Sequence, residues 1–156
     1  MLIMTILLLI GILTASCVML YVMLNRRDNT MRDYIVLSIF LSILGMVSYL
    51  VELHAPGLDT KLTGVKFGYM SKLLVTPMLA SFVLEYYRIR VNWLWKFAIY
   101  IIPMILQIFI FTCDSNTLYY KKYWLGDDNL IHITPGPVYF FTMGFSLLLT
   151  VFYVFC

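Results

Sequence analysis

Long apolar runs alternate with short polar segments along the whole chain. At a rise of 1.5 Å per residue, about 20 residues of helix cross the hydrocarbon core of a bilayer. Five runs approach or exceed that length, at residues 2–24, 34–51, 65–87, 93–113 and 137–156. The pattern predicts an all-α fold, a polytopic bundle of transmembrane helices.

The composition is typical of an integral membrane protein. Hydrophobic residues make up 62% of the chain and charged residues only 12%, whereas soluble domains average about half and about a quarter. No segment between the runs is long enough to bury a core of its own, so we expect residues 1–156 to contain no soluble domain. The net charge of +3 is spread over short loops, which argues against nucleic-acid binding.

The distribution of basic residues predicts the orientation. Segments on the cytoplasmic side of a membrane protein are enriched in Lys and Arg. The connections after the first and third runs carry Arg26, Arg27, Arg32, Arg88, Arg90 and Lys96. The remaining connections mix Lys61, Lys66, Lys121 and Lys122 with Glu52, Asp59, Asp114, Asp127 and Asp128. We therefore expect an extracytoplasmic N-terminus.

The run at 65–87 contains ionisable residues and a proline. An ionisable side chain within a bilayer must reach an interface, pair or face a wet interior. Lys72 is expected to extend toward the outer interface, and Glu85 to pair with Arg88 three residues later. Pro77, like Pro103 in the next run, is a candidate helix kink, which is either a packing feature or a signalling hinge.

Polar and small residues recur at helical spacing on three of the expected helices. The sets are Ser38, Ser42, Gly45 and Tyr49; Tyr69, Lys72 and Thr76; and Tyr139, Thr142, Ser146 and Thr150. Such faces allow helices to approach closely in lipid. The alternative is a polar pocket within the membrane, open to the outside, with Lys72 at its rim.

The longest polar segment, residues 114–134, places tyrosines and a tryptophan around Lys121 and Lys122. Amphipathic aromatic residues beside lysines suit the headgroup layer, so this segment is expected to lie on the outer bilayer surface. A lid over a ligand site is the alternative. Pro137, after Pro135 and Gly136, is suited to begin the fifth helix.

Enzymatic, metal and redox chemistry find little support in the sequence. There is no glycine-rich phosphate loop, no HExxH and no GxSxG. His54 and His132, even with nearby carboxylates, match no common metal-binding spacing. The three cysteines are far apart and form no recognisable framework. We predict no catalytic activity, metal or cofactor in this chain.

Several short motifs, in order, resemble the N-terminal seven-helix membrane region of bacterial sensor histidine kinases and of related receptors with diguanylate cyclase outputs. They are Lys66-Phe67-Gly68-Tyr69, Pro77, Phe82 with Glu85-Tyr86, Ile102-Pro103, Thr112 followed by Leu118-Tyr119-Tyr120, and Gly136-Pro137 with Tyr139. The family pattern after Thr112 continues with Asn and one or two histidines. Cys113, Asn116 and Thr117 stand there instead, so no histidine role is carried over.

The resemblance implies a membrane input region of a bacterial signal-transduction receptor. It would sense an extracytoplasmic or intramembrane stimulus, such as an unidentified small ligand, and relay it to a cytoplasmic kinase or cyclase. The family has seven helices, so we expect two further helices and the output domain to follow Cys156 in a longer protein of the bacterial cytoplasmic membrane. Homodimerisation through that further part is left open. The candidate ligand-facing residues are Tyr69, Lys72, Asp114, Asn116, Tyr119 and Tyr139.

Two other functions remain open at this stage. A fragment of a small-solute transporter would use Lys72, Pro77 and Pro103 in broken helices around a midplane site. A membrane assembly subunit would instead place Gly45 and Gly144 at helix contacts.

Overall fold

The computed structural model describes residues 2–24, 30–126 and 130–155 of the chain. Its elements in chain order are α1 (Leu2–Leu24), α2 (Thr30–His54), α3 (Leu58–Tyr86), α4 (Trp93–Phe111), β1 (Tyr120–Leu125), β2 (Ile131–Pro135) and α5 (Pro137–Phe155). The predicted all-α helical bundle is confirmed. Within the described residues, α1 to α4 are long and apolar enough to cross a membrane, and the apolar stretch of α5 is shorter.

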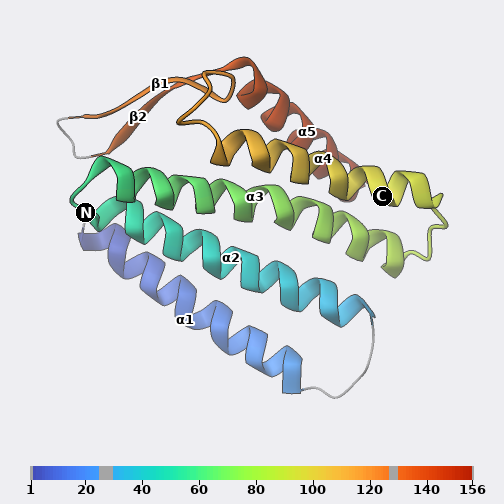
Figure 1. Ribbon diagram of the computed structural model, residues 1–156. Helices are drawn as coiled ribbons and strands as arrows, with labels where there is room; N and C mark the ends of the chain where they lie inside the picture. The colour runs from blue at the N-terminus through green and yellow to red at the C-terminus, as the bar shows by residue number, and fades with distance from the viewer. Residues whose placement is uncertain (1, 25–29, 127–129, 156) are drawn as a thin grey trace.

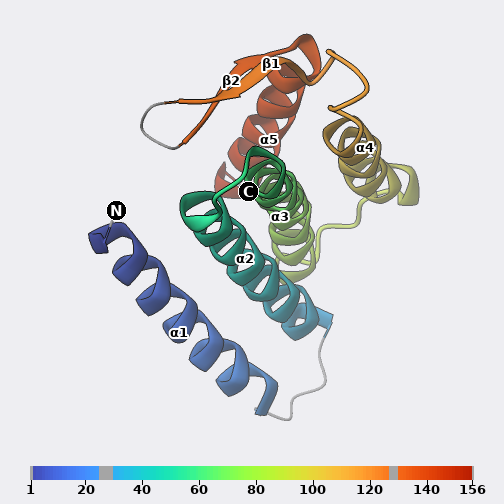
Figure 2. The same cartoon turned by 60° about the vertical axis from the view of Figure 1, so that its left-hand side comes forward.

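The helix α3 lies at the centre of the bundle. Figures 1 and 2 show α1, α2 and α3 side by side in chain order, with α4 and α5 beyond α3. Helix α3 contacts α2 most extensively and also contacts α4 and α5, whereas α4 and α5 scarcely meet. A movement of α3 therefore reaches three other helices directly.

Two of the predicted helix boundaries are wrong at the end where α2 meets α3. Helix α2 continues to His54 rather than 51, and α3 begins at Leu58 rather than 65. Lys61 is therefore a helical residue rather than a loop residue, and both Lys61 and Lys66 are buried. The Lys61 ammonium donates to the carbonyl oxygen of Glu52 at 2.6 Å, so the helix end accommodates charges that the hydropathy pattern places in a loop.

The α2–α3 contact depends on small residues. A Cβ added at Gly64 would lie 2.9 Å from the Ser48 carbonyl oxygen, and one at Gly45 would lie 3.4 Å from the Ser71 Cβ. The serine hydroxyls on this contact donate to carbonyls one turn earlier in their own helices, so close backbone approach, rather than bonding between the helices, is their role here. In contrast, Gly144 in α5 has no such neighbour within 4 Å.

The polar segment between α4 and α5 folds into an antiparallel hairpin, β1–β2, which the helical prediction missed. Trp124 on β1 stacks on His132 of the facing strand, with ring centroids 5.7 Å apart. Gly136 follows the hairpin, and its N–H donates to the Tyr119 carbonyl oxygen at 2.8 Å. Helix α5 then begins at Pro137, as the position of that proline predicts.

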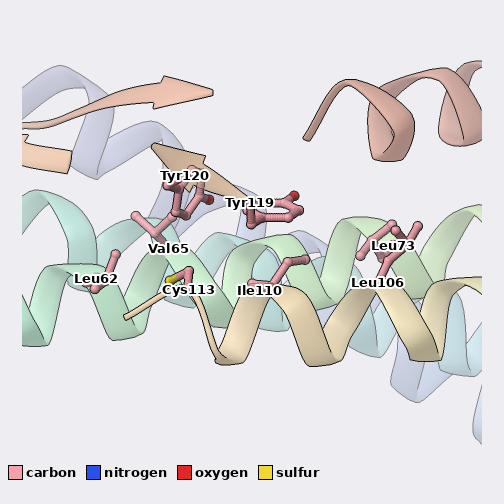
Figure 3. Packing of buried hydrophobic residues seen from close by; sticks show 8 residues of the cluster. All are labelled: Leu62, Val65, Leu73, Leu106, Ile110, Cys113, Tyr119 and Tyr120. Carbon is pink, nitrogen blue, oxygen red and sulfur yellow. The ribbon is translucent and has the colours of Figure 1, made fainter. Parts of the chain in front are cut away.

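The buried core lies between α3, α4 and the start of the hairpin. Figure 3 shows the side chains of Val65, Cys113 and Tyr120 near one end of this cluster and those of Leu73 and Leu106 at the other. Pro77 and Pro103 are also buried, and neither interrupts its helix. By contrast, α1 buries none of its described residues within the chain, as suits a helix at the edge of a bundle in lipid.

The expected pair between Glu85 and Arg88 is wrong. Helix α3 ends at Tyr86, and Arg88 adopts a left-handed backbone conformation with φ of 52°. The Arg88 N–H donates to the Glu85 carbonyl oxygen at 3.1 Å, but no ion pair joins the two side chains in the described structure. Residues three apart are neighbours only while the helix continues.

Candidate functional site

Four tyrosines from three parts of the fold form a cluster near the hairpin end of the bundle. Tyr69 belongs to α3, Tyr119 and Tyr120 to the start of the hairpin, and Tyr139 to α5. Their ring centroids lie 4.7 to 6.4 Å apart, most of them edge to face, an arrangement that aromatic rings favour. The Tyr69 hydroxyl donates to that of Tyr139 at 3.4 Å. The tyrosine cluster thus joins α3, α5 and the hairpin.

Two hydroxyls in the tyrosine cluster are buried without a hydrogen-bond partner among the described residues, namely those of Tyr119 and Tyr120. Thr142 lies near Tyr119; its hydroxyl donates to the Val138 carbonyl oxygen at 2.9 Å, and its oxygen remains able to accept a hydrogen bond. Burial is the largest cause of a raised pKa at both phenols, so both remain protonated at neutral pH. The cluster therefore holds two neutral donors whose hydrogen bonds are not made within the described chain.

A chamber of about 110 Å³ lies between α2 and α3, beside the tyrosine cluster. Its walls carry one acidic side chain, one basic side chain and two tyrosines. The lining residues are Gly45, Tyr49, Glu52, Gly64, Val65, Gly68, Tyr69 and Lys72. The Lys72 ammonium lies 5.2 Å from the centroid of the Tyr69 ring, within the range of a cation–π contact. Tyr69 therefore belongs to both the chamber and the tyrosine cluster.

A second set of polar contacts ties the hairpin to α3. Lys66 forms an ion pair with Asp114, the residue that follows Cys113 after α4. The Tyr123 hydroxyl donates to the other carboxylate oxygen of Asp114 at 3.4 Å. Burial is the largest cause of the raised pKa of the Cys113 thiol. The positive charge of Lys66 acts to lower this pKa, and the negative charge of Asp114 acts to raise it. Asp114 thus connects α3, the end of α4 and β1.

The predicted ligand-facing residues divide into three groups. The structure brings Tyr69, Tyr119 and Tyr139 together and places Lys72 against Tyr69. Asp114 lies apart in its ion pair with Lys66. Asn116 also lies apart, since its amide nitrogen donates to the Thr112 carbonyl oxygen and its amide oxygen accepts from the Leu118 N–H. The side chain of Asn116 shapes the turn after α4.

Sequence reasoning missed three residues that the geometry singles out. Glu52 lines the chamber. Its helical spacing from Gly45 and Tyr49 places it on the same face of α2, but the predicted helix ends at residue 51 and so excludes it. Tyr120 completes the tyrosine cluster, and only its neighbour Tyr119 had been selected. In α4, both polar atoms of the Gln107 side-chain amide are buried with no hydrogen-bond partner among the described residues. In the sequence, Gln107 is distinguished only as a single amide within an apolar run.

Both histidines make contacts that join different elements of the fold. His54 shares a hydrogen bond of 3.0 Å with Thr5 of α1, and His132 stacks on Trp124. The described residues contain no group of three His, Cys, Asp or Glu side chains placed to hold a metal ion. Asp127 and Asp128, which the sequence places near His132, lie outside the described residues.

The chain was compared with models of known protein families, and one of them matches most of its length. The model of the N-terminal 7TM region of histidine kinase matches residues 7–156. The chain belongs to this family. It is a multi-pass membrane protein and a membrane sensor input region of the kind found in kinase-type receptors. No curated protein and no solved structure matches the chain.

Proposed function

We propose that this chain senses an extracytoplasmic or intramembrane stimulus and relays it through its helices to a cytoplasmic kinase output. The observation that carries the proposal is the position of Tyr69. This single side chain on the central helix contacts the chamber, the hairpin and α5. A stimulus that moves Tyr69 acts on every element that meets there.

The mechanism follows from tight packing. Closely packed side chains do not deform continuously, so a displaced ring forces its neighbours into a different arrangement, and helices respond by small shifts. Displacement of Tyr69 changes the packing of Tyr139, which lies in the first turn of α5. Helix α5 is 19 residues long, so a shift at its first turn is carried to its other end, about 28 Å away.

The orientation that fits this relay has the hairpin outside the cell. The N-terminus, the α2–α3 connection and the hairpin lie at one end of the bundle, and the α3–α4 connection and the C-terminus lie toward the other (Figure 1). Arg88, Arg90 and Lys96 follow α3 or begin α4 at that second end, which supports a cytoplasmic position for it. The chamber then opens near the outer side.

The transporter alternative fits the helices less well. A site between broken helices needs an unwound segment near the middle of the bundle. Helix α3 runs unbroken from Leu58 to Tyr86 through Pro77, and α4 from Trp93 to Phe111 through Pro103. Neither proline opens its helix to form such a site.

The relay is tested with the native reading frame that contains this chain, expressed in membrane vesicles. The measurement is ATP-dependent autophosphorylation, compared between the unaltered protein, Tyr69→Ala and the matched control Tyr87→Ala, whose side chain is exposed just after α3. We expect Tyr69→Ala to change the phosphorylation level and the control to leave it unchanged. Equal levels in all three, or no phosphorylated product from the intact frame, would contradict the relay.

A further inference from the structure

The chamber between α2 and α3 contains two opposite charges that do not neutralise each other by direct contact. The Lys72 ammonium lies over the Tyr69 ring, and no ion pair in the described structure includes Lys72 or the Glu52 carboxylate. The Glu52 and Lys72 side chains line the same chamber, so their opposite charges act on each other across it. A charged group within a membrane bundle needs a partner or water.

The helix geometry explains why the two charges face each other across a gap. Gly45 lies level with Ser71, so in this antiparallel pair Glu52 is offset from Lys72 by eight residues, about 12 Å, along the bundle axis. Side chains lean toward the N-terminus of their own helix. Because α2 and α3 are antiparallel neighbours (Figure 1), Glu52 and Lys72 lean toward one another from the two ends of the chamber.

The neighbouring charges do not fill this gap. The buried Lys61 directs its ammonium to the Glu52 carbonyl oxygen, and Lys66 pairs with Asp114 on the hairpin side of α3. The chamber therefore presents one anionic end, one cationic end and the tyrosines Tyr49 and Tyr69 between them. A bound water needs about 10–15 Å³ of such space, so a volume of about 110 Å³ admits several waters or one small solute.

We propose that the chamber binds a small zwitterion, whose cationic group contacts Glu52 and whose anionic group contacts Lys72. The ligand class is that of an α-amino acid or betaine; the ammonium and phosphate of a phosphatidylethanolamine headgroup present the same chemistry. The inference rests on the proposed sensor function, since it names the chemical class of the stimulus. The bound ligand lies against Tyr69, which is the link to the tyrosine cluster and α5.

The test measures binding directly, so that it does not depend on any kinase output. The chain is placed in phosphatidylglycerol nanodiscs and dialysed to equilibrium against a radiolabelled mixture of the common α-amino acids and glycine betaine. Acetate and ethylamine, each carrying only one of the two charges, serve as separate probes. A second arm places the chain in discs containing labelled phosphatidylethanolamine and measures lipid retained through purification in phosphatidylglycerol.

We expect retention of a zwitterion in one of the two arms and much weaker retention of acetate and ethylamine. Retention in the first arm identifies a soluble solute and in the second a headgroup. Glu52→Gln and Lys72→Gln should each weaken binding about tenfold or more, because the protein charge that contacts the ligand is lost, and with an α-amino acid a charge-assisted hydrogen bond is lost with it. Lys72→Arg, which keeps the charge, should retain binding. The controls Glu85→Gln and Lys96→Gln, near the other end of the bundle, should bind as the unaltered chain does.

Three results would overturn the proposal. They are the absence of zwitterion binding in both arms by a chain whose circular dichroism shows intact helices, equal binding of acetate or ethylamine, and equal binding by Glu52→Gln and Lys72→Gln. The first result would mean that the chamber holds only water, the second that it does not require both charges, and the third that the ligand binds elsewhere. These results leave the relay itself untouched, since autophosphorylation that depends on Tyr69 would still establish a sensor with another stimulus.

Discussion

Replacement of Gly64 by alanine should separate the two most extensively packed helices. The added Cβ would lie 2.9 Å from the Ser48 carbonyl oxygen, 3.2 Å from the Glu52 backbone nitrogen and 3.3 Å from a methyl group of Val51. Two of these three atoms belong to the backbone of α2 and cannot rotate away. Relief of the contact therefore requires α2 and α3 to move apart.

The magnitude follows from two opposing effects. Forcing an extra methyl group into a packed contact costs about 1–3 kcal/mol, whereas alanine is favoured over glycine in a helix by up to about 1 kcal/mol. Gly64→Ala should therefore lower the free energy of unfolding by about 1–2 kcal/mol. Gly144→Ala is the matched control, since a Cβ there meets nothing within 4 Å, and it should be neutral or slightly stabilising.

The assay is unfolding by sodium dodecyl sulfate in mixed micelles, followed by far-ultraviolet circular dichroism. The account expects Gly64→Ala to unfold at a lower detergent fraction than the unaltered chain, and Gly144→Ala at the same or a higher fraction. If Gly64→Ala were as stable as Gly144→Ala, close backbone approach would not be what holds α2 against α3, and the reasoning would be refuted.

Two substitutions and one reactivity measurement test the hairpin end of the bundle. Tyr120→Phe removes a buried hydroxyl that has no partner among the described residues, so it should stabilise the chain by about 1 kcal/mol in the same assay; a loss of stability would indicate that the hydroxyl is bonded. Gly136→Ala would place a Cβ 2.2 Å from the Leu118 carbonyl oxygen, so limited proteolysis should cut its hairpin faster than that of the unaltered chain, and unchanged cleavage would contradict the packing. Because burial, reinforced by Asp114, raises the pKa of Cys113, less thiolate is present at neutral pH. Its alkylation should be slower than that of free cysteine and should keep rising at pH values where the reaction of free cysteine has levelled off; matching pH profiles would contradict the raised pKa.

The hydropathy pattern was sufficient for the helical bundle because every helix contains a long apolar stretch, and in α1 to α4 that stretch is long enough to cross a membrane. It failed where charges are buried by specific contacts. The pattern begins α3 at 65 rather than Leu58, since Lys61 resembles a loop residue until the Glu52 carbonyl oxygen that accepts its hydrogen bond is known. The hairpin was missed for a related reason, because β1 includes adjacent lysines among aromatic residues, a composition equally typical of a surface segment.

The candidate site was only partly visible in the sequence. Tyr69, Tyr119 and Tyr139 were selected as candidates, but 50 positions separate Tyr69 from Tyr119 along the chain, and only the fold brings them together. Glu52 was counted among loop charges, and its place opposite Lys72 depends on the antiparallel pairing of α2 and α3. Spacing along one helix predicts which residues share a face; it does not predict which face of another helix they meet.

The central claim is that Tyr69 couples the hairpin to α5, and hydrogen exchange of the chain in nanodiscs tests it most directly. Mass spectrometry would compare the amides of Tyr69→Ala with those of the unaltered chain and of Tyr87→Ala. We expect faster exchange in both the hairpin and α5 of Tyr69→Ala, with α1 unchanged and Tyr87→Ala like the unaltered chain. Unchanged exchange in α5 of Tyr69→Ala, or a uniform increase that includes α1, would contradict the coupling.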